Sequence, residues 1–408
     1  MATEAQPPAG KGPQTGNILE VLLVFLRLGL TSFGGPIAHL GYFREELVVR
    51  RKWLDEQAYA ELVGLCQFLP GPASSQVSFS IGLMRAGYGG ALAAWIGFTL
   101  PSAVALVLFA YGAGALDGPV GRGLVHGLKL VAVAIVAQAV WHMARTLCPD
   151  RERASIAVVS ALVILFSSSS AAQIGAIALG GAAGLWLCRH APPVPPRPIR
   201  MPVSRSAGVL ALIAFFGLLI GLPLVDVMTS SPLVSLFDAF FRSGALVFGG
   251  GHVVLPLLSE AIVAPGWVSE SAFLAGYGAA QAMPGPLFTF AAYLGTVATI
   301  GPRGIAGAVL GLIGIFLPGI LILLGTLPFW DTFRQRRGAQ AAMSGVNAAV
   351  VGLLAAALYD PVWTGSVTSI GDFGIALAGL VLLTAWRAPP LAVVVFSALG
   401  GIAMALAH

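Results

Sequence analysis

Charged side chains are scarce in this sequence: Asp, Glu, Lys and Arg together make up 10% of its 408 residues. Soluble domains carry about 25%. A water-soluble globular fold is therefore excluded, in agreement with a mean hydropathy of +0.88. The net charge of +5 lies in short polar stretches, where it sets membrane orientation and does not indicate a nucleic-acid partner.

Metal-ligating and catalytic patterns are also missing. The three cysteines, Cys66, Cys148 and Cys188, have neither metal nor redox spacing, and we expect them to be packing thiols. No His-x-x-x-His, no Glu-x-x-His and no pair of carboxylates lies inside an apolar segment. We therefore expect no metal, no cofactor and no enzymatic activity.

Most of the sequence consists of long apolar segments. Residues 1–17 lack the apolar region of a signal peptide and are expected to be a disordered tail. Beyond them, many apolar runs reach the roughly 17–25 residues that span a bilayer. Lipid does not tolerate unsatisfied backbone, so these runs predict an all-α polytopic membrane protein. They fall near residues 18–38, 58–70, 73–86, 89–112, 124–147, 154–169, 171–188, 207–225, 236–256, 270–283, 286–300, 303–327, 340–358, 370–386 and 389–407.

Two stretches about 215 residues apart contain the same residues in the same order. The first runs from Arg27 to Pro72 and the second from Arg242 to Pro286. Each has Arg-x-Gly, Phe-Gly-Gly, Trp, Gln and Pro-Gly-Pro. Internal repeats of this kind are typical of secondary transporters. Further matches are Gly87 and Gly90 with Gly301 and Gly304, Leu100-Pro101 with Leu317-Pro318, and Gly127-Leu128-Lys129 with Gly345-Val346-Asn347.

The repeat divides the chain into two homologous halves. A Pro- and Arg-rich segment at 189–206 is expected to be an extended cytoplasmic linker. We expect the first transporter repeat over 18–188, a connecting transmembrane helix over 207–235 and the second repeat over 236–408.

Basic residues fall on opposite loops of the two halves. Four of them lie between 44 and 52, whereas the matching loop 257–270 has neither Lys nor Arg. Two further pairs of loops alternate in the same way, with basic residues at 334–337 and 145–153 and few or none at 113–123 and 359–372. By the positive-inside rule, this alternation predicts an inverted-topology repeat.

In an inverted repeat, the chain must cross the membrane an odd number of times between a position in the first half and its matched position in the second half. If every apolar segment crossed the membrane, the number of crossings would be even. The count fits if each Phe-Gly-Gly segment enters the membrane, turns at the glycines and leaves on the same side. The segments around each Pro-Gly-Pro are about 13–15 residues long, too short to span, and we interpret them as a second re-entrant hairpin. Non-helical backbone at membrane depth is permitted where it lines a cavity.

Each Phe-Gly-Gly and each Pro-Gly-Pro would place a helix N-terminus at mid-membrane. Such ends expose free N–H groups and a partial positive charge, so they bind anions. The alternative is that the glycines serve close helix packing and the prolines make kinks. On the first interpretation, the predicted substrate-binding residues are Arg27, Arg242, Gly34, Gly35, Gly249, Gly250, Gly251, Gln67, Pro70, Gly71, Pro72, Ser74, Ser75, Gln281, Pro284, Gly285, Pro286 and Thr289.

Several of these residues have a second interpretation. An arginine in apolar sequence is usually functional, and its fork suits a tetrahedral oxyanion, but Arg27 and Arg242 could instead snorkel to the interface. Gln67 and Gln281 either bind substrate or cap the broken backbone. Candidate coupling or accessory residues are His39, His252, Lys129, Asn347, Glu45 and Glu260. Alternatively, each histidine is hydrogen-bonded to a carbonyl, Lys129 anchors the helix at the membrane interface, and Glu45 and Glu260 are solvated loop carboxylates.

The duplicated pattern, from Arg27 to Pro72 and from Arg242 to Pro286, resembles the chromate ion transporter (CHR) family in its long, two-domain form. The resemblance covers nearly the whole chain. It implies a multi-pass protein of the bacterial or archaeal inner membrane that exports chromate and confers chromate resistance. The first half has Gly34-Gly35-Pro36 where the second has three glycines, which leaves open whether both halves hold the anion equally.

The function favoured by the sequence is a secondary transporter for a tetrahedral oxyanion. The residues alone do not separate chromate from sulfate, because both are tetrahedral dianions of similar size. An oxyanion (sulfate) uptake carrier and an anion channel, which needs weak binding at several sites in a continuous pore, are the alternatives. The expected partners are the anion and membrane lipid, with no nucleic acid, and a homodimer is left open.

Overall fold

All secondary structure in the described part of the chain is helical, which confirms the predicted all-α membrane protein. The computed structural model describes residues 16–33, 35–113, 118–167, 170–188, 201–248, 251–330 and 336–407. Gly34, Gly249, Gly250, most of the tail and most of the linker lie outside these ranges. Six helices are long and apolar enough to cross a membrane: 73–112, 119–147, 205–229, 304–329, 337–363 and 390–407.

The two halves contain the same order of elements. The first half contains α1 (Ile18–Thr31), α2 (Gly35–Phe43), η1 (Arg44–Arg50), α3 (Glu56–Phe68), α4 (Ala73–Ala113), α5 (Pro119–Leu147), α6 (Arg151–Phe166) and α7 (Ser170–Leu187). A single long helix, α8 (Arg205–Thr229), follows.

The second half begins again with a short helix that ends before the repeated glycines. It contains α9 (Pro232–Ala245), η2 (Gly251–Val253), α10 (Val254–Leu258), η3 (Ser259–Val263), α11 (Glu270–Ala282), η4 (Leu287–Thr289), α12 (Phe290–Val297), α13 (Gly304–Thr326), η5 (Leu327–Phe329), α15 (Arg337–Ala357), η6 (Leu358–Trp363), α16 (Ile370–Thr384) and α17 (Pro390–Ala407).

The helices break where the repeated glycines and prolines stand. α1 ends three residues before Gly34 and α2 begins at Gly35, while α9 ends at Ala245 and η2 begins at Gly251. α3 and α11 end immediately before the two Pro-Gly-Pro sequences. α4 also contains a break, because Ala86 and Gly87 have non-helical backbone angles. Residues 73–85 are therefore a short helix like α12, and the predicted broken helices are confirmed.

In the first half, the hairpin around Phe-Gly-Gly and the hairpin around Pro-Gly-Pro both end near the start of α1. Glu20, at the start of α1, forms ion pairs with Arg51 after η1 (3.6 Å) and with Arg85 at the break in α4 (3.3 Å). Trp53 lies under both guanidinium groups. The second half closes in the same way, since the Thr299 N–H beyond α12 donates to the Trp267 carbonyl after η3 (3.0 Å). These contacts match the predicted re-entrant hairpins.

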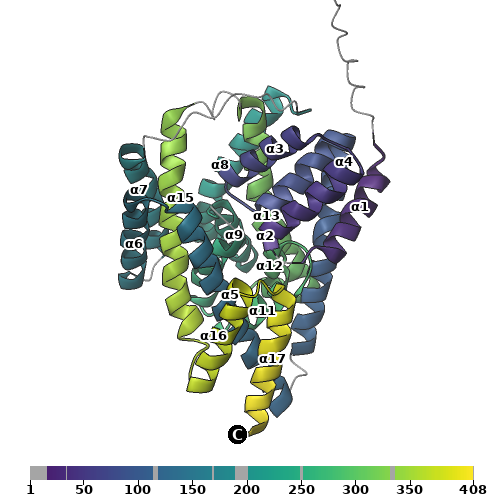
Figure 1. The fold of residues 1–408 in the computed structure, drawn as a ribbon. Helices are drawn as coiled ribbons and strands as arrows, with labels where there is room; N and C mark the ends of the chain where they lie inside the picture. The colour runs from purple at the N-terminus through teal and green to yellow at the C-terminus, as the bar shows by residue number, and fades with distance from the viewer. Residues whose placement is uncertain are drawn as a thin grey trace, which may run out of the picture.

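Two long helices, α5 and α15, pack against helices of the other half. Gly127 lets α5 approach the backbone of Ser397 and Ala398 in α17, and Gly345 lets α15 approach Gly180 in α7. These glycines are matched positions of the repeat, so the exchange is reciprocal. Figure 1 shows α6 and α7 beside α15 on one flank, with α16 and α17 at the end that carries the C-terminus.

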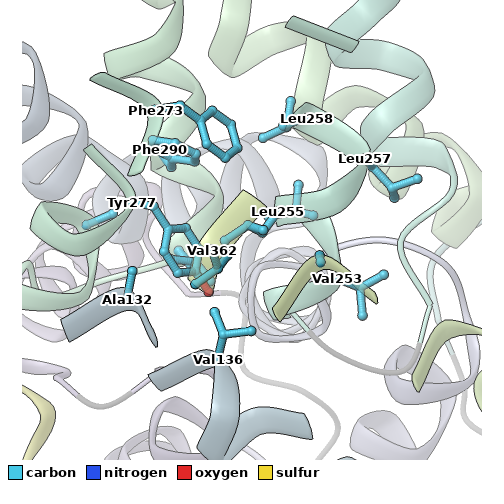
Figure 2. Close-up of a cluster of buried hydrophobic side chains, with 14 of the residues drawn as sticks. Ala132, Val136, Val253, Leu255, Leu257, Leu258, Phe273, Tyr277, Phe290 and Val362 are labelled. Carbon is cyan, nitrogen blue, oxygen red and sulfur yellow. The ribbon is translucent and has the colours of Figure 1, made fainter. Parts of the chain in front are cut away.

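The re-entrant segments of the second half are deeply buried. Figure 2 shows apolar side chains from η2 and α10 meeting those of α11, α12 and α5. Phe273, Tyr277 and Phe290 are fully buried there, and the rings of Phe273 and Phe290 are 5.2 Å apart in an edge-on arrangement. This packing fixes the position of the two broken segments against a helix of the other half.

Candidate functional site

Four helix N-termini, two from each half, converge on one cavity of about 740 Å³. They are the starts of α2, α4, η2 and η4, each directly after a repeated glycine or proline. The first N–H groups of a helix have no acceptor inside the helix, and they carry its partial positive charge. The residues these ends contribute to the wall are Pro36, Gly71, Pro72, Ala73, Ser74, Gly251, His252, Pro286, Leu287 and Phe288.

Two reciprocal hydrogen bonds fasten the halves together at these ends. The Gly71 N–H donates to the Val247 carbonyl (2.7 Å), and the Gly285 N–H donates to the Ser32 carbonyl (2.9 Å). Ser32 and Val247 are matched positions, each directly before a Phe-Gly-Gly sequence. The Pro-Gly-Pro of one half is therefore hydrogen-bonded to the residue that precedes the Phe-Gly-Gly of the other half.

The same two glycines also approach the backbone or a side chain of the other half closely. Gly71 has φ +112° and lies against Gly319, and Gly285 has φ +99° and lies against Ser102. Both partners directly follow the proline of a matched Leu-Pro pair in a long helix. Only glycine adopts such backbone angles readily and leaves room for this contact.

A glutamine caps one of the broken backbones, but it is not one of the two that the sequence suggested. The amide of Gln76 donates to the carbonyls of Pro70 and Gly319 (both 2.9 Å), and so spans the first Pro-Gly-Pro and the opposite half. Gln67 is exposed on the cavity wall, and Gln281 lies outside it.

The predicted polar side chains reach the cavity unevenly. His252 is on the wall and its Nδ1 lies 2.7 Å from the Tyr277 hydroxyl, which corrects the expectation of a carbonyl partner. Ser74 is on the wall with its hydroxyl 3.5 Å from His39 Nδ1. Asn347 also lines the cavity. The Thr289 hydroxyl donates instead to the Pro286 carbonyl (2.7 Å).

Neither predicted arginine lies on the cavity wall. The side chain of Arg27 is exposed on α1. Arg242 lies 2.7 Å from the carboxylate of Asp238, one turn earlier on α9, and Asp238 is only 2% exposed. The matched position in the first half is Leu23, so this ion pair is not duplicated. The binding role of both arginines stays a prediction.

The remaining predicted residues lie beside the cavity or away from it. Lys129 is near the carboxylate of Glu270, and Glu45 forms an ion pair with Arg50 in η1, as a solvated loop carboxylate would. Gly34, Gly249 and Gly250 are outside the described residues. The others that are not among the wall residues are Gly35, His39, Pro70, Ser75, Glu260, Pro284 and Gly285.

The mouth of the cavity contains residues that were not predicted. Its floor, at Ser74, Gly251 and Pro286, is buried, whereas its exposed end is formed by α5 and by the turn between α16 and α17. Three polar residues of α5 line this end at a spacing of four, which places them on one helix face and was a signal in the sequence. They are Gln138, His142 and Thr146, and the exposed residues Thr384 and Arg387 also line this end.

The charge of the wall is one-sided. Among its described residues Arg387 is the only full cation, and neither Asp nor Glu is present. No cluster of three or more His, Cys, Asp or Glu side chains suited to a metal occurs in the described part of the chain. The arrangement suits a small anion held by backbone N–H groups.

Comparisons with known proteins show which proteins the chain is similar to. The chain is 29% identical to the chromate transport protein of Pseudomonas aeruginosa, over 98% of this chain and 93% of that protein. It is 25% identical to the chromate transport protein of Cupriavidus metallidurans, over 97% and 95%. The half-length uncharacterized transporter YwrB of Bacillus subtilis is 31% identical over 42% of this chain and 88% of its own length.

No solved structure matches the chain. The family model for chromate transporters matches residues 19–185 and 234–402, which correspond to the two halves of the fold. The resemblance noted in the sequence is thereby confirmed, and the chain is a multi-pass membrane protein with transporter relatives. It belongs to the chromate transporter family.

Proposed function

We propose that this chain is a secondary transporter that exports chromate across the inner membrane of a bacterium or archaeon and so confers chromate resistance. The observation that carries the proposal is the meeting of four helix N-termini around one cavity, whose described wall residues include no carboxylate. A tetrahedral dianion can accept hydrogen bonds from several N–H groups at once. The helix dipoles and the absence of negative side chains favour its charge.

The cavity mouth supports export from the cytoplasm. The mouth lies where α5 ends, and Arg145, Arg151 and Arg153 lie close to that end. By the positive-inside rule this is the cytoplasmic side, so the structure corresponds to an inward-open state. The membrane potential favours export of a dianion, by roughly 2.3 kcal/mol per charge for each 100 mV.

Alternating access follows from an inverted relation between the halves. The reciprocal bonds of Gly71 and Gly285 support a two-fold relation, and the loop charges support an axis in the membrane plane. A rocking movement of one half against the other would close the cytoplasmic mouth and open an equivalent mouth on the opposite side.

Matched cysteines test this inversion. Val49→Cys and Ala264→Cys occupy equivalent positions, both exposed, just after the two Phe-Gly-Gly hairpins. In a background without Cys66, Cys148 and Cys188, an impermeant maleimide should label Ala264→Cys in whole cells and Val49→Cys in inside-out vesicles. Permeabilised cells, in which both should react, are the control. Labelling of both positions from the same face would contradict inversion.

Uptake of labelled chromate into inside-out vesicles tests the function itself. We expect saturable uptake that a positive interior potential accelerates and that unlabelled chromate exchanges in counterflow. Conductance without counterflow would indicate a channel, and uptake of sulfate without chromate would indicate a sulfate carrier.

The same assay tests the predicted arginines. Unchanged uptake by both Arg27→Gln and Arg242→Gln would remove the arginines from the mechanism.

A further inference from the structure

We propose that Arg387 is the charge-selecting residue of this transporter, which draws divalent oxyanions into the cavity mouth and sets the apparent affinity rather than the turnover. The proposal rests on the proposed function and adds a residue that the repeated motifs do not contain. Arg387 is exposed in the turn between α16 and α17 and lines the mouth, and the Gln138 amide of the polar α5 face donates to the Leu383 carbonyl just before this turn (3.3 Å).

The charge of Arg387 is not cancelled locally. No carboxylate of the described residues lies within 4.0 Å of its guanidinium group, unlike Arg242, which pairs with Asp238. The same end of the wall contains His142 and Thr146, neither of which carries a negative charge. An anion entering from the cytoplasm therefore meets one uncompensated positive charge before it reaches the helix ends.

The backbone of Arg387 has a conformation that glycine usually adopts at the end of a helix. Its φ is +53°, in the left-handed region, and the turn is closed by the Ala388 N–H donating to the Leu382 carbonyl (2.9 Å). Glycine is the residue that normally ends a helix in this conformation, because it has no Cβ to strain.

Two other non-glycine residues of the described chain have positive φ, Lys52 and Ser230, and neither lines the cavity. Lys52 has almost the same angle, φ +52°, and is an exposed cation on the same cytoplasmic side. It is therefore a matched control for both the backbone strain and the charge of Arg387.

The electrostatic attraction between a single cation at the solvated mouth and an anion is proportional to the charge of the anion. A dianion gains twice the Coulomb energy of a monoanion, and in water at about 7 Å the attraction corresponds to roughly a five- to tenfold change in apparent affinity. The attraction also weakens with ionic strength, because the Debye length is about 8 Å at 0.15 M. Arg387 should therefore favour divalent over monovalent oxyanions, most strongly at low salt.

The test compares Arg387→Gly, Arg387→Lys and Lys52→Gly by chromate uptake into inside-out vesicles. We expect Arg387→Gly to raise KM about five- to tenfold at low salt, with a maximal rate within about twofold of wild type and an equal or higher melting temperature. Arg387→Lys should retain most of the affinity. Lys52→Gly should relieve similar strain and leave KM unchanged.

The salt dependence separates this role from a structural one. The KM of wild type should rise with ionic strength, whereas that of Arg387→Gly should change little. Three results for Arg387→Gly would overturn the inference: an unchanged KM, a lowered maximal rate at constant KM, or a KM increase that does not depend on salt. If wild type still takes up chromate, the proposed function stands in each case. Absence of saturable chromate uptake by wild type would overturn both.

Discussion

Replacing Gly285 or Gly71 with alanine is expected to lower chromate transport at least tenfold. The angles of φ +99° and +112° are strained for any residue with a Cβ, at a cost of about 1–2 kcal/mol. The added Cβ would also lie 2.8 Å from the Ser102 hydroxyl oxygen at Gly285, or 2.9 Å from the Gly319 Cα at Gly71. Relief of either contact moves the glycine N–H away from its acceptor in the other half, and so displaces a helix end from the cavity.

Gly64→Ala is the matched control for these two variants. Gly64 lies in α3, in the same hairpin as Gly71, and a Cβ there would meet no atom within 4 Å. Its transport should stay within about twofold of wild type, because alanine is the better helix former. Initial rates in inside-out vesicles, normalised to protein in the membrane, give the comparison. Wild-type rates in Gly285→Ala would show that the tips can move without affecting transport.

Asn347→Asp is expected to reduce chromate transport at least a hundredfold. Asn347 lies on the cavity wall, where the described residues include no carboxylate. A carboxylate about 6 Å from a bound dianion costs roughly 5 kcal/mol at an effective dielectric constant of about 20. The substitution changes one amide to a carboxylate of nearly the same shape, so the charge is the main difference.

The uncharged variant Asn347→Leu isolates the charge from the lost amide. It should reduce transport only a few-fold, since one hydrogen bond contributes about 0.5–1.5 kcal/mol. Uptake at several pH values adds a second check, because protonation of an introduced aspartate should restore transport of a dianion at low pH. Equal losses in the aspartate and leucine variants would contradict an anion at this wall.

The positions of the helix breaks were predictable because they depend on local chemistry. Gly34-Gly35 and Pro70-Gly71-Pro72 restrict the backbone wherever they occur, and their matches in the second half repeat the restriction. Short segment length and loop charge then suggested hairpins that return to one side. The ion pairs of Glu20 match that interpretation.

The pairing between halves was not predictable in the same way. The Gly71 N–H donates to the carbonyl of Val247, the residue before the Phe-Gly-Gly of the other half. Nothing in the sequence of one half indicates this partner. That contact depends on how two similar surfaces dock, and the residues of either half alone carry no record of it. The exchange of α7 and α17 between halves was missed for the same reason.

The duplicated arginines show the limit of reasoning from repetition. Arg27 and Arg242 stand seven residues before a glycine in the sequence, neither lies on the cavity wall, and Asp238 forms an ion pair with Arg242. The cation on the wall is Arg387, which has no repeated partner in any motif. Repetition therefore identified the shared scaffold of the cavity, whereas the charge at its mouth comes from one half alone.

Calorimetric titration of the purified, cysteine-free protein with chromate tests the central claim most directly. If helix ends from both halves form one shared site, each chain binds one chromate ion, and Asn347→Asp weakens that binding at least tenfold while Gly64→Ala leaves it unchanged. Two independent chromate ions per chain, or an unchanged affinity in Asn347→Asp, would contradict a single oxyanion site at the meeting point of the four helix ends.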